Sequence, residues 1–174
     1  MPVSKSRIDP YKNFKFRIKW NGNYVAAVSE VSGFTRTTQT LSYRDQESPI
    51  HTMPLPGQTK ASAIILERGI SYDTEFQQWA NTIWDYSNTT TDNTSHSLQD
   101  FRKDIIIELY NEAGQKVLAY NVYNCWPSAY TALPELDGLG NAVAIQSLVL
   151  QNEGWERDTS IIEPTEPDFD KPRQ

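Results

Sequence analysis

The stretch "FKFRIKWNGNYVAAV", residues 14–28, indicates an antiparallel β-fold. In its first seven residues, large apolar side chains alternate strictly with basic ones. Such alternation is typical of a strand with one buried and one exposed face. Asn21-Gly22 follows, the residue pair best suited to the positive φ angles of a tight hairpin turn. We therefore predict that "NYVAAV" returns as the partner strand.

Strand patterns continue along the rest of the chain. "GFTRTTQTLSYR" is rich in β-branched residues but polar on both faces, so we expect this strand to face water or another polar surface. More apolar strands are predicted by "ASAIILERG", "DIIIELY", "QKVLAYNVYNCW" and "NAVAIQSLVLQNEG". Between two of these strand patterns lies "SYRDQESPIHTMPLPGQTK", Ser42 to Lys60, which is too long and too rich in Pro and charge for a hairpin turn. We interpret it as an extended polar arm.

One segment has helical rather than strand periodicity. In "SYDTEFQQWANTIWDY" the apolar residues recur at spacings of three and one, with Asp73 or Thr74 placed to cap the start. This helix is expected to pack Trp79 and Trp84 against the sheet, while Trp20 belongs to the core. The predicted fold class is mainly β: an antiparallel sandwich or barrel of about six to eight strands, with one flanking helix and the extended arm.

Composition excludes several classes of function. A chain of 174 residues with net charge −6 fits one domain and lacks the basic footprint of a general nucleic-acid binder. The charge is uneven, because residues 1–20 are basic and residues 156–174 are acidic, so opposite ends are candidates to mate between copies. We expect synthesis in the cytoplasm without a signal peptide, since no apolar run approaches a membrane span.

The sequence offers no convincing catalytic or metal site. Cys125 stands alone, without a disulfide partner or zinc-type ligand spacing, and is expected to be a small buried side chain. Asp45, Ser48 and His51 suggest a triad, but three residues of one loop are more often only a polar loop. Asp104 and Glu108 are expected on a solvated strand face. We therefore predict no enzyme, no cofactor and no small-molecule substrate.

Ordered motifs give the chain a family resemblance. They are "SEVSGF" (Ser29 to Phe34), "YR" (Tyr43-Arg44), "LPG" (Leu55 to Gly57), "LERG" (Leu66 to Gly69), "NCWPS" (Asn124 to Ser128) and "GNAVAIQSLVLQNEG" (Gly140 to Gly154). The series, from about Asp9 to Arg157, resembles the tail tube proteins of contractile phages and of phage-tail-like contractile injection systems, the T4-like tail tube superfamily. Among the motif positions we single out Gly33, Phe34, Arg68, Gly69, Trp126, Pro127, Glu153 and Gly154.

The resemblance implies a structural subunit of an inner tube. Six copies would close into a ring by joining their sheets, and rings would stack into a hollow tube that a contracting sheath drives through a target envelope. Partners would be sheath and baseplate proteins, with a protein effector or DNA as unbound lumen cargo, in a phage tail or injection-system particle. The arm would supply the contacts between subunits and rings, through Tyr43, Arg44, Asp45, Glu47, His51, Met53, Leu55, Pro56 and Gly57.

From the resemblance we expect the chain to divide into a tail-tube β domain, residues 1–157, and an acidic, Pro-rich tail, residues 158–174. Two alternatives stay open. One is a baseplate-proximal paralogue that initiates the tube. The other, from a different class, is a monomeric β-sandwich that binds a ligand such as carbohydrate on Trp126, Tyr130 or Trp155.

Overall fold

The computed structural model describes residues 15–25, 27–44, 52–88, 101–136 and 143–164. Within these ranges the chain forms ten strands and one helix, so the predicted mainly β class is confirmed. In chain order they are β1 (Phe16–Trp20), β2 (Asn23–Val25), β3 (Val28–Val31), β4 (Arg36–Arg44), β5 (Thr52–Ala61), β6 (Ile64–Gly69), α1 (Glu75–Asn88), β7 (Lys103–Tyr110), β8 (Lys116–Thr131), β9 (Ile145–Gln151) and β10 (Gly154–Arg157).

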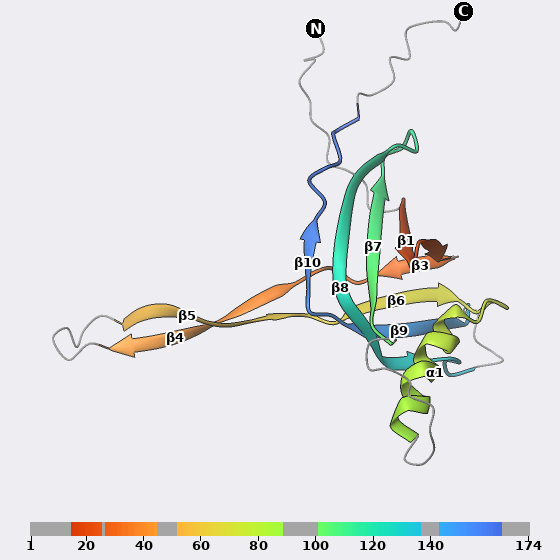
Figure 1. Cartoon of the computed structure of the whole chain (residues 1–174), viewed down its shortest axis with the longest axis horizontal. Helices are drawn as coiled ribbons and strands as arrows, with labels where there is room; N and C mark the ends of the chain where they lie inside the picture. Colours follow the sequence, from red (N-terminus) through yellow and green to blue (C-terminus); the bar gives the residue numbers. More distant parts are fainter. Residues whose placement is uncertain (1–14, 26, 45–51, 89–100, 137–142, 165–174) are drawn as a thin grey trace, which may run out of the picture.

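Eight of these strands form one strongly bent antiparallel sheet, in the order β2-β1-β7-β8-β9-β6-β3, with β10 pairing the free side of β8. The sixteen-residue strand β8 belongs to both halves: its first part pairs β7 and β10, and its second part pairs β9. The two halves cross in Figure 1, where β7 and β8 stand upright and β6 and β9 run across them. In the described residues the strand order does not return on itself, so one copy does not close a barrel.

A bulge in β8 makes the corner between the halves. Lys103 pairs with Cys125 but Ile105 pairs with Val122, so β8 carries one extra residue at this point. Asn124 lies in the bulge with φ of 50°, a conformation that Asn tolerates better than most residues. Its backbone N–H donates to Asp104 Oδ1 at 2.8 Å, which holds the bend against β7.

The core lies between the two halves and the helix. Its members come from β1, β2, β6, β7, β8, β9 and α1, and they form one cluster: Ile18, Trp20, Val25, Ile64, Leu66, Phe76, Trp79, Ile105, Ile107, Val122, Cys125, Leu148 and Leu150. The Trp20 ring centre lies 5.0 Å from that of Trp79 and 5.9 Å from that of Phe76. The helix is therefore part of the core and not an appendage.

Helix α1 begins where the sequence predicted, but one of its two tryptophans is exposed and does not pack against the sheet. Asp73 Oδ1 accepts the backbone N–H of Glu75 at 2.9 Å and caps the first turn. Trp79 is buried and its indole N–H donates to the Phe101 carbonyl at 2.7 Å. Trp84 is 69% exposed, so its predicted packing is wrong. Five residues turn a helix by about 140° from Trp79, which places Trp84 outside the buried stripe.

The segment after the first turn also differs from the prediction. Asn23 to Val25 pair with β1 as expected, but Ala27 has φ of 60° and the chain then changes partner. Strand β3, from Val28, pairs with β6 in the other half of the sheet. The predicted strand "NYVAAV" is thus divided between the two halves. Within the part of the chain that the structure describes, no helix is long and apolar enough to cross a membrane.

Candidate assembly surface

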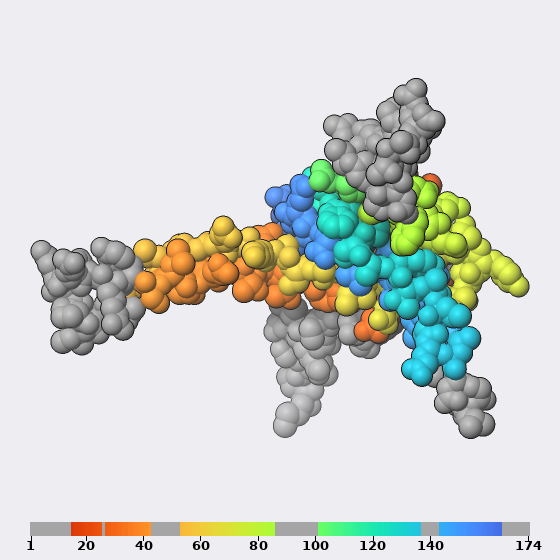
Figure 2. Space-filling model, turned by 90° about the horizontal axis from the view of Figure 1, so that it is seen from below, coloured from red at the N-terminus to blue at the C-terminus, as the bar shows by residue number. Residues whose placement is uncertain are grey.

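Strands β4 and β5 form a two-stranded ribbon that pairs with no other strand of the described chain. It extends from the body as a narrow arm (Figure 1), coloured orange to yellow in Figure 2. The segment interpreted from the sequence as an extended polar arm is therefore a β-strand from Thr52 onward. Pro54 and Pro56 are tolerated in β5 because a strand with one neighbour needs hydrogen bonds along only one of its edges, and residues two apart share an edge.

The outer half of this ribbon is amphipathic although it has no body to cover. Leu41 pairs with Leu55, and Met53 lies two residues from Leu55, so all three side chains share one face. These side chains are 57%, 49% and 53% exposed, respectively. We call these three residues the apolar ribbon face. The expectation that this strand is not sealed in a core holds for Arg36 to Ser42, all of which are exposed.

The close approach of the two ribbon strands accounts for the glycine at position 57. The register shifts between Thr38 and Thr40, where β5 carries an extra residue. A Cβ on Gly57 would lie 3.1 Å from the Gln39 carbonyl oxygen and 3.3 Å from Leu41 Cγ. The two strands therefore approach so closely at this bulge that a larger residue would require a small shift of its neighbours.

The base of the ribbon is fastened to the body. Arg36 donates to the Trp155 carbonyl at 2.9 Å, and its guanidinium lies 4.8 Å from the centre of the Trp155 ring. That ring stacks on Phe34 with centres 5.5 Å apart. Next to this point the two ends of the ribbon are joined, because the Ser62 N–H, just after β5, donates to the Thr35 carbonyl, just before β4, at 2.9 Å. The contacts of Arg36 with Trp155 fix the ribbon relative to β10.

The arm positions predicted as contacts divide into three groups. Met53, Leu55 and Pro56 are exposed on β5, and Gly57 is partly covered at the bulge. Tyr43 and Arg44 continue β4, and their backbones pair with Met53 and Thr52. Asp45, Glu47 and His51 lie outside the described residues, as does the Asp45, Ser48 and His51 combination considered for catalysis.

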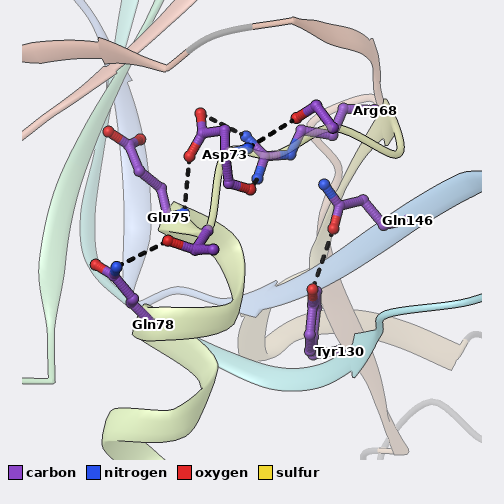
Figure 3. A network of polar contacts seen from close by, with 8 residues as sticks. Arg68, Asp73, Glu75, Gln78, Tyr130 and Gln146 are labelled. Atoms are coloured by element: carbon purple, nitrogen blue, oxygen red, sulfur yellow. Dashed lines mark hydrogen bonds and ion pairs between the residues drawn. The ribbon is translucent and has the colours of Figure 1, made fainter.

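Arg68, at the end of β6, joins the sheet to the start of the helix (Figure 3). Its side chain is fully buried, donates to Asp73 Oδ2 at 3.0 Å and to the Asp73 carbonyl at 2.7 Å, and lies 4.1 Å from the Phe76 ring centre. Because a guanidinium only donates, the amide of Gln146 fits best turned over from its orientation in Figure 3, with its oxygen toward Arg68 Nε at 2.5 Å. The "LERG" motif thus has a structural role here.

Other motif positions also serve the bend of the sheet. The Glu153 carboxylate accepts from Asn124 Nδ2, and the Glu153 N–H donates to the Tyr123 carbonyl at 3.1 Å. Gly154 has φ of 145°, which only glycine adopts readily. Pro127 is buried in the second part of β8, beside a second register shift. Trp126 and Gly69 are partly buried and Gly33 is exposed.

Glu108 is the polar residue that sequence reasoning misplaced. It is 5% exposed and not solvated as predicted. Its carboxylate accepts from Tyr110 at 2.7 Å and Tyr24 at 3.1 Å, and Lys116 Nζ lies 3.4 Å away. Burial alone would raise the pKa of Glu108, but the tyrosine hydroxyls and the charge of Lys116 together lower it. Burial and the bond to Glu108 raise the pKa of Tyr110.

The thiol, the metal-ligating side chains and the aromatic rings of the described residues do not form a catalytic, metal or carbohydrate site. Cys125 is fully buried, as predicted, and burial raises the pKa of its thiol to about 12. Among the described residues, no group of three metal-ligating side chains is close enough to hold an ion. Trp155 already contacts Phe34, Tyr120 and Arg36, and Tyr130 bonds Gln146, so these rings pack against the protein's own side chains.

Comparison with known proteins agrees with this geometry. The chain is 26% identical to a chain in the cryo-EM structure of an extracellular contractile injection system, the PVC sheath-tube complex in the extended state. That match has a TM-score of 0.66 and covers 90% of this chain and 99% of the other. A chain in the anti-feeding prophage cap is 25% identical, with a TM-score of 0.69, and coverage is 90% and 95%.

A chain in the anti-feeding prophage baseplate shares the fold, with a TM-score of 0.70 at 19% identity and coverage of 87% and 97%. No curated protein sequence matches this chain significantly. The family model described as T4-like virus tail tube protein gp19 matches residues 12–156. The chain therefore belongs to this family and is a structural tail tube protein of a phage tail or contractile injection system, not an enzyme.

Proposed function

We propose that copies of this chain close into hexameric rings that stack into a hollow tube, with the β4–β5 ribbon as the contact between rings. The observation that carries this proposal is the ribbon itself. Among the described residues its strands pair only with each other, and the apolar ribbon face of Leu41, Met53 and Leu55 is about half exposed. An exposed apolar face on a projecting element costs a monomer solubility and stabilises only an assembly.

Open sheet edges support ring closure. Strands β2 and β3 stand at the two ends of the strand order in the described residues. Unpaired edges are templates for further pairing, and a ring in which each copy pairs with the next removes them. A head-to-tail contact of this kind closes when its rotation divides the circle.

The proposed tube works within a particle. A sheath surrounds it and drives it through a target envelope, a baseplate initiates it, and a protein effector or DNA passes through its lumen without specific binding. The 26% identity to a chain of a sheath-tube complex supports these partners. The net charge of −6 suits a conduit for DNA, because like charge keeps DNA from adhering. The chain is made in the bacterial cytoplasm before assembly.

Negative-stain electron microscopy, with mass determination by light scattering across concentrations, tests the proposal. We expect rings with sixfold symmetry and a mass six times the 19.9 kDa of one chain, lengthening into tubes as concentration rises. Rings that never lengthen would instead identify a tube initiator. A stable monomer at high concentration that also stays monomeric on a preformed baseplate would refute the tube role.

A further inference from the structure

Exposed apolar side chains gather at the end of the body that lies opposite the ribbon. Strands β6 and β8 end there, and β9, which lies between them in the sheet, begins there. Gly69 pairs with Ile145, and the Ile70 N–H donates to the Ala144 carbonyl at 3.1 Å, so the two isoleucines lie side by side on adjacent segments. We call four exposed side chains from these segments the apolar end: Ile70, Leu133, Val143 and Ile145.

The apolar end is a group and not a set of scattered residues. Leu133 follows by two residues the last residue of β8, which pairs with Ser147, and Val143 precedes Ile145 by two residues. The four side chains are 39% to 78% exposed. Single exposed apolar residues are ordinary on a protein surface, whereas a group of them marks a place where another surface binds.

The ribbon and the apolar end lie at opposite ends of the same strands. Strand β3 leads into β4 and β5 leads into β6 through short connections, so the ribbon continues the half of the sheet that contains β6. Strand β6 then runs from Ile64 to Gly69, away from the ribbon. Figure 1 shows the ribbon at one end of the long axis and the end of β6 toward the other, and Figure 2 shows the same separation.

A stack of rings requires this kind of arrangement. If copies are to be added repeatedly in the same orientation, a surface at one end of a copy must bind a different surface at the other end of the next copy. The apolar ribbon face is one such surface, and its occupant must also be apolar for the contact to remove both from water. The apolar end meets both conditions, because it is apolar and lies at the opposite end.

Other exposed apolar side chains in the described residues offer no equivalent surface. The Tyr24 ring lies beneath the cations of β1, and the Tyr123 hydroxyl donates to a carboxylate of β10. Ile65, Trp84 and Ile162 lie on three different segments of the chain. Within the part of the chain that the structure describes, the apolar end is therefore the best match for the ribbon.

Building on the proposed function, we infer that the apolar end receives the apolar ribbon face of a copy in the next ring. Leu41 and Leu55 of one copy lie against Ile70 and Ile145 of the other, and a single contact buries both exposed groups. Each ring then keeps one unused set of ribbons on one side and one unused set of apolar ends on the other. The tube therefore grows with all its rings in the same orientation.

Two complementary variants of the full-length chain test the inference. Ile70→Ser with Ile145→Ser alters the apolar end and keeps the ribbon, whereas Leu41→Ser with Leu55→Ser does the reverse. We expect each variant alone to form rings and to need at least about tenfold more protein than wild type to form tubes. When preformed rings of the two variants are mixed, one intact contact remains. We expect pairs of rings that grow no further, with a mass twelve times the 19.9 kDa of one chain by light scattering.

Ile65→Ser is the matched control. Ile65 is 39% exposed, as is Ile145, but it lies near the start of β6, at the ribbon end of the body. We expect this variant to form tubes at the wild-type concentration. Unfolding midpoints of all three variants verify that they fold.

Disulfide cross-linking locates the contact independently. Leu55→Cys and Ile145→Cys are placed in separate proteins, so that a link between them joins two copies. The native Cys125 is fully buried and does not compete. A disulfide needs Cα atoms about 4–7 Å apart, so we expect Leu55→Cys to link to Ile145→Cys at least about tenfold more than to Lys116→Cys. Lys116 is the control position because it lies at the other end of β8.

Several results would overturn the inference. Wild-type-like tubes from Ile70→Ser with Ile145→Ser, or mixed variant rings that never pair, would exclude the apolar end and leave the tube role intact. Links of Leu55→Cys chiefly to Lys116→Cys, or to Leu55→Cys of another copy, would place the ribbon elsewhere. A wild-type chain that forms neither rings nor tubes, even on a preformed baseplate, would remove the proposed function and this inference together.

Discussion

The body and the ribbon of this protein are built from similar strands but are stabilised in different ways. In the body, the apolar side chains on the inner face of β6, β7 and β9 belong to one buried cluster that also includes Phe76 and Trp79 of the helix. In the ribbon, Leu41, Met53 and Leu55 are exposed on two strands that pair with no other strand in the described part of the chain. The body thus contains its own partners, whereas the apolar ribbon face would find its partners in another copy under the proposed assembly.

Similar substitutions are therefore expected to have different effects in the body and in the ribbon. Removing an apolar side chain from the body leaves a cavity and lowers the free energy of unfolding. Removing one from the ribbon exposes less apolar surface in the monomer and leaves the core unchanged. Stability and assembly are therefore separable by mutation, and four variants test the separation.

The largest effect is expected for Trp79→Ala in helix α1. This side chain is 1% exposed and packs on Trp20, so its loss lowers the free energy of unfolding by about 3–5 kcal/mol. Trp84→Ala, on the same helix but 69% exposed, changes it by less than about 0.5 kcal/mol. Urea unfolding followed by circular dichroism measures both. Equal losses in the two variants would contradict the orientation of the helix.

Arg68→Ala is expected to cost about 3 kcal/mol. The substitution leaves Asp73 without its ion pair and opens space beside Phe76 and Gln146. The contacts of Arg68 with Asp73 join β6 to the start of the helix. We therefore expect the first turn of α1 to lose the most protection against hydrogen exchange. Lys60→Ala on the ribbon is the control, with a change within about 0.5 kcal/mol. Unchanged hydrogen-exchange protection of this first turn in Arg68→Ala would show that the Arg68–Asp73 contacts are not needed to hold the helix start.

The double variant Leu41→Ser and Leu55→Ser tests the ribbon. The proposed ring contact loses apolar area on both strands, so we expect the concentration needed for tubes to rise at least about tenfold. The free energy of unfolding changes by less than about 1 kcal/mol, because neither residue touches the core. Sedimentation of tubes gives the first value and urea unfolding the second. Thr38→Ser, on the same ribbon but outside its apolar face, serves as the control. Normal tubes from the double variant would exclude the apolar ribbon face as the contact.

The smallest effect concerns Glu108. Its pKa is lowered in the folded chain, so its contribution to stability is present above the ordinary value of 4.5 and is lost as pH falls through the lower folded value. Wild type is therefore expected to lose more stability than Glu108→Gln between pH 6 and about pH 3. Urea unfolding at both pH values measures the difference. A parallel loss in the two proteins would mean that the tyrosine bonds do not favour the charged form.

Periodicity predicted the body well because each local pattern there has a partner within the same chain. Alternation in β1 and β7 and the stripe of α1 gave the core residues Ile18, Trp20, Phe76 and Trp79. Periodicity did not predict the surroundings of a residue where the element that packs on it or pairs with it is distant in sequence. Glu108 looks solvated until Tyr24, from β2, covers it. The proline-containing arm was expected to be extended and polar, and its pairing with β4 makes its second half a strand.

The amino-acid sequence by itself determined the mainly β class, the place of the helix, the absence of a recognisable catalytic motif and the family. These follow from side-chain periodicity, turn residues and ordered motifs, which are local properties of the chain. Only the tertiary structure decided that β8 serves both halves of the sheet, that Arg68 joins the sheet to the helix, and that the arm is a ribbon with one apolar face. Strand register and the burial of polar groups depend on residues far apart in sequence, and only folding brings them together.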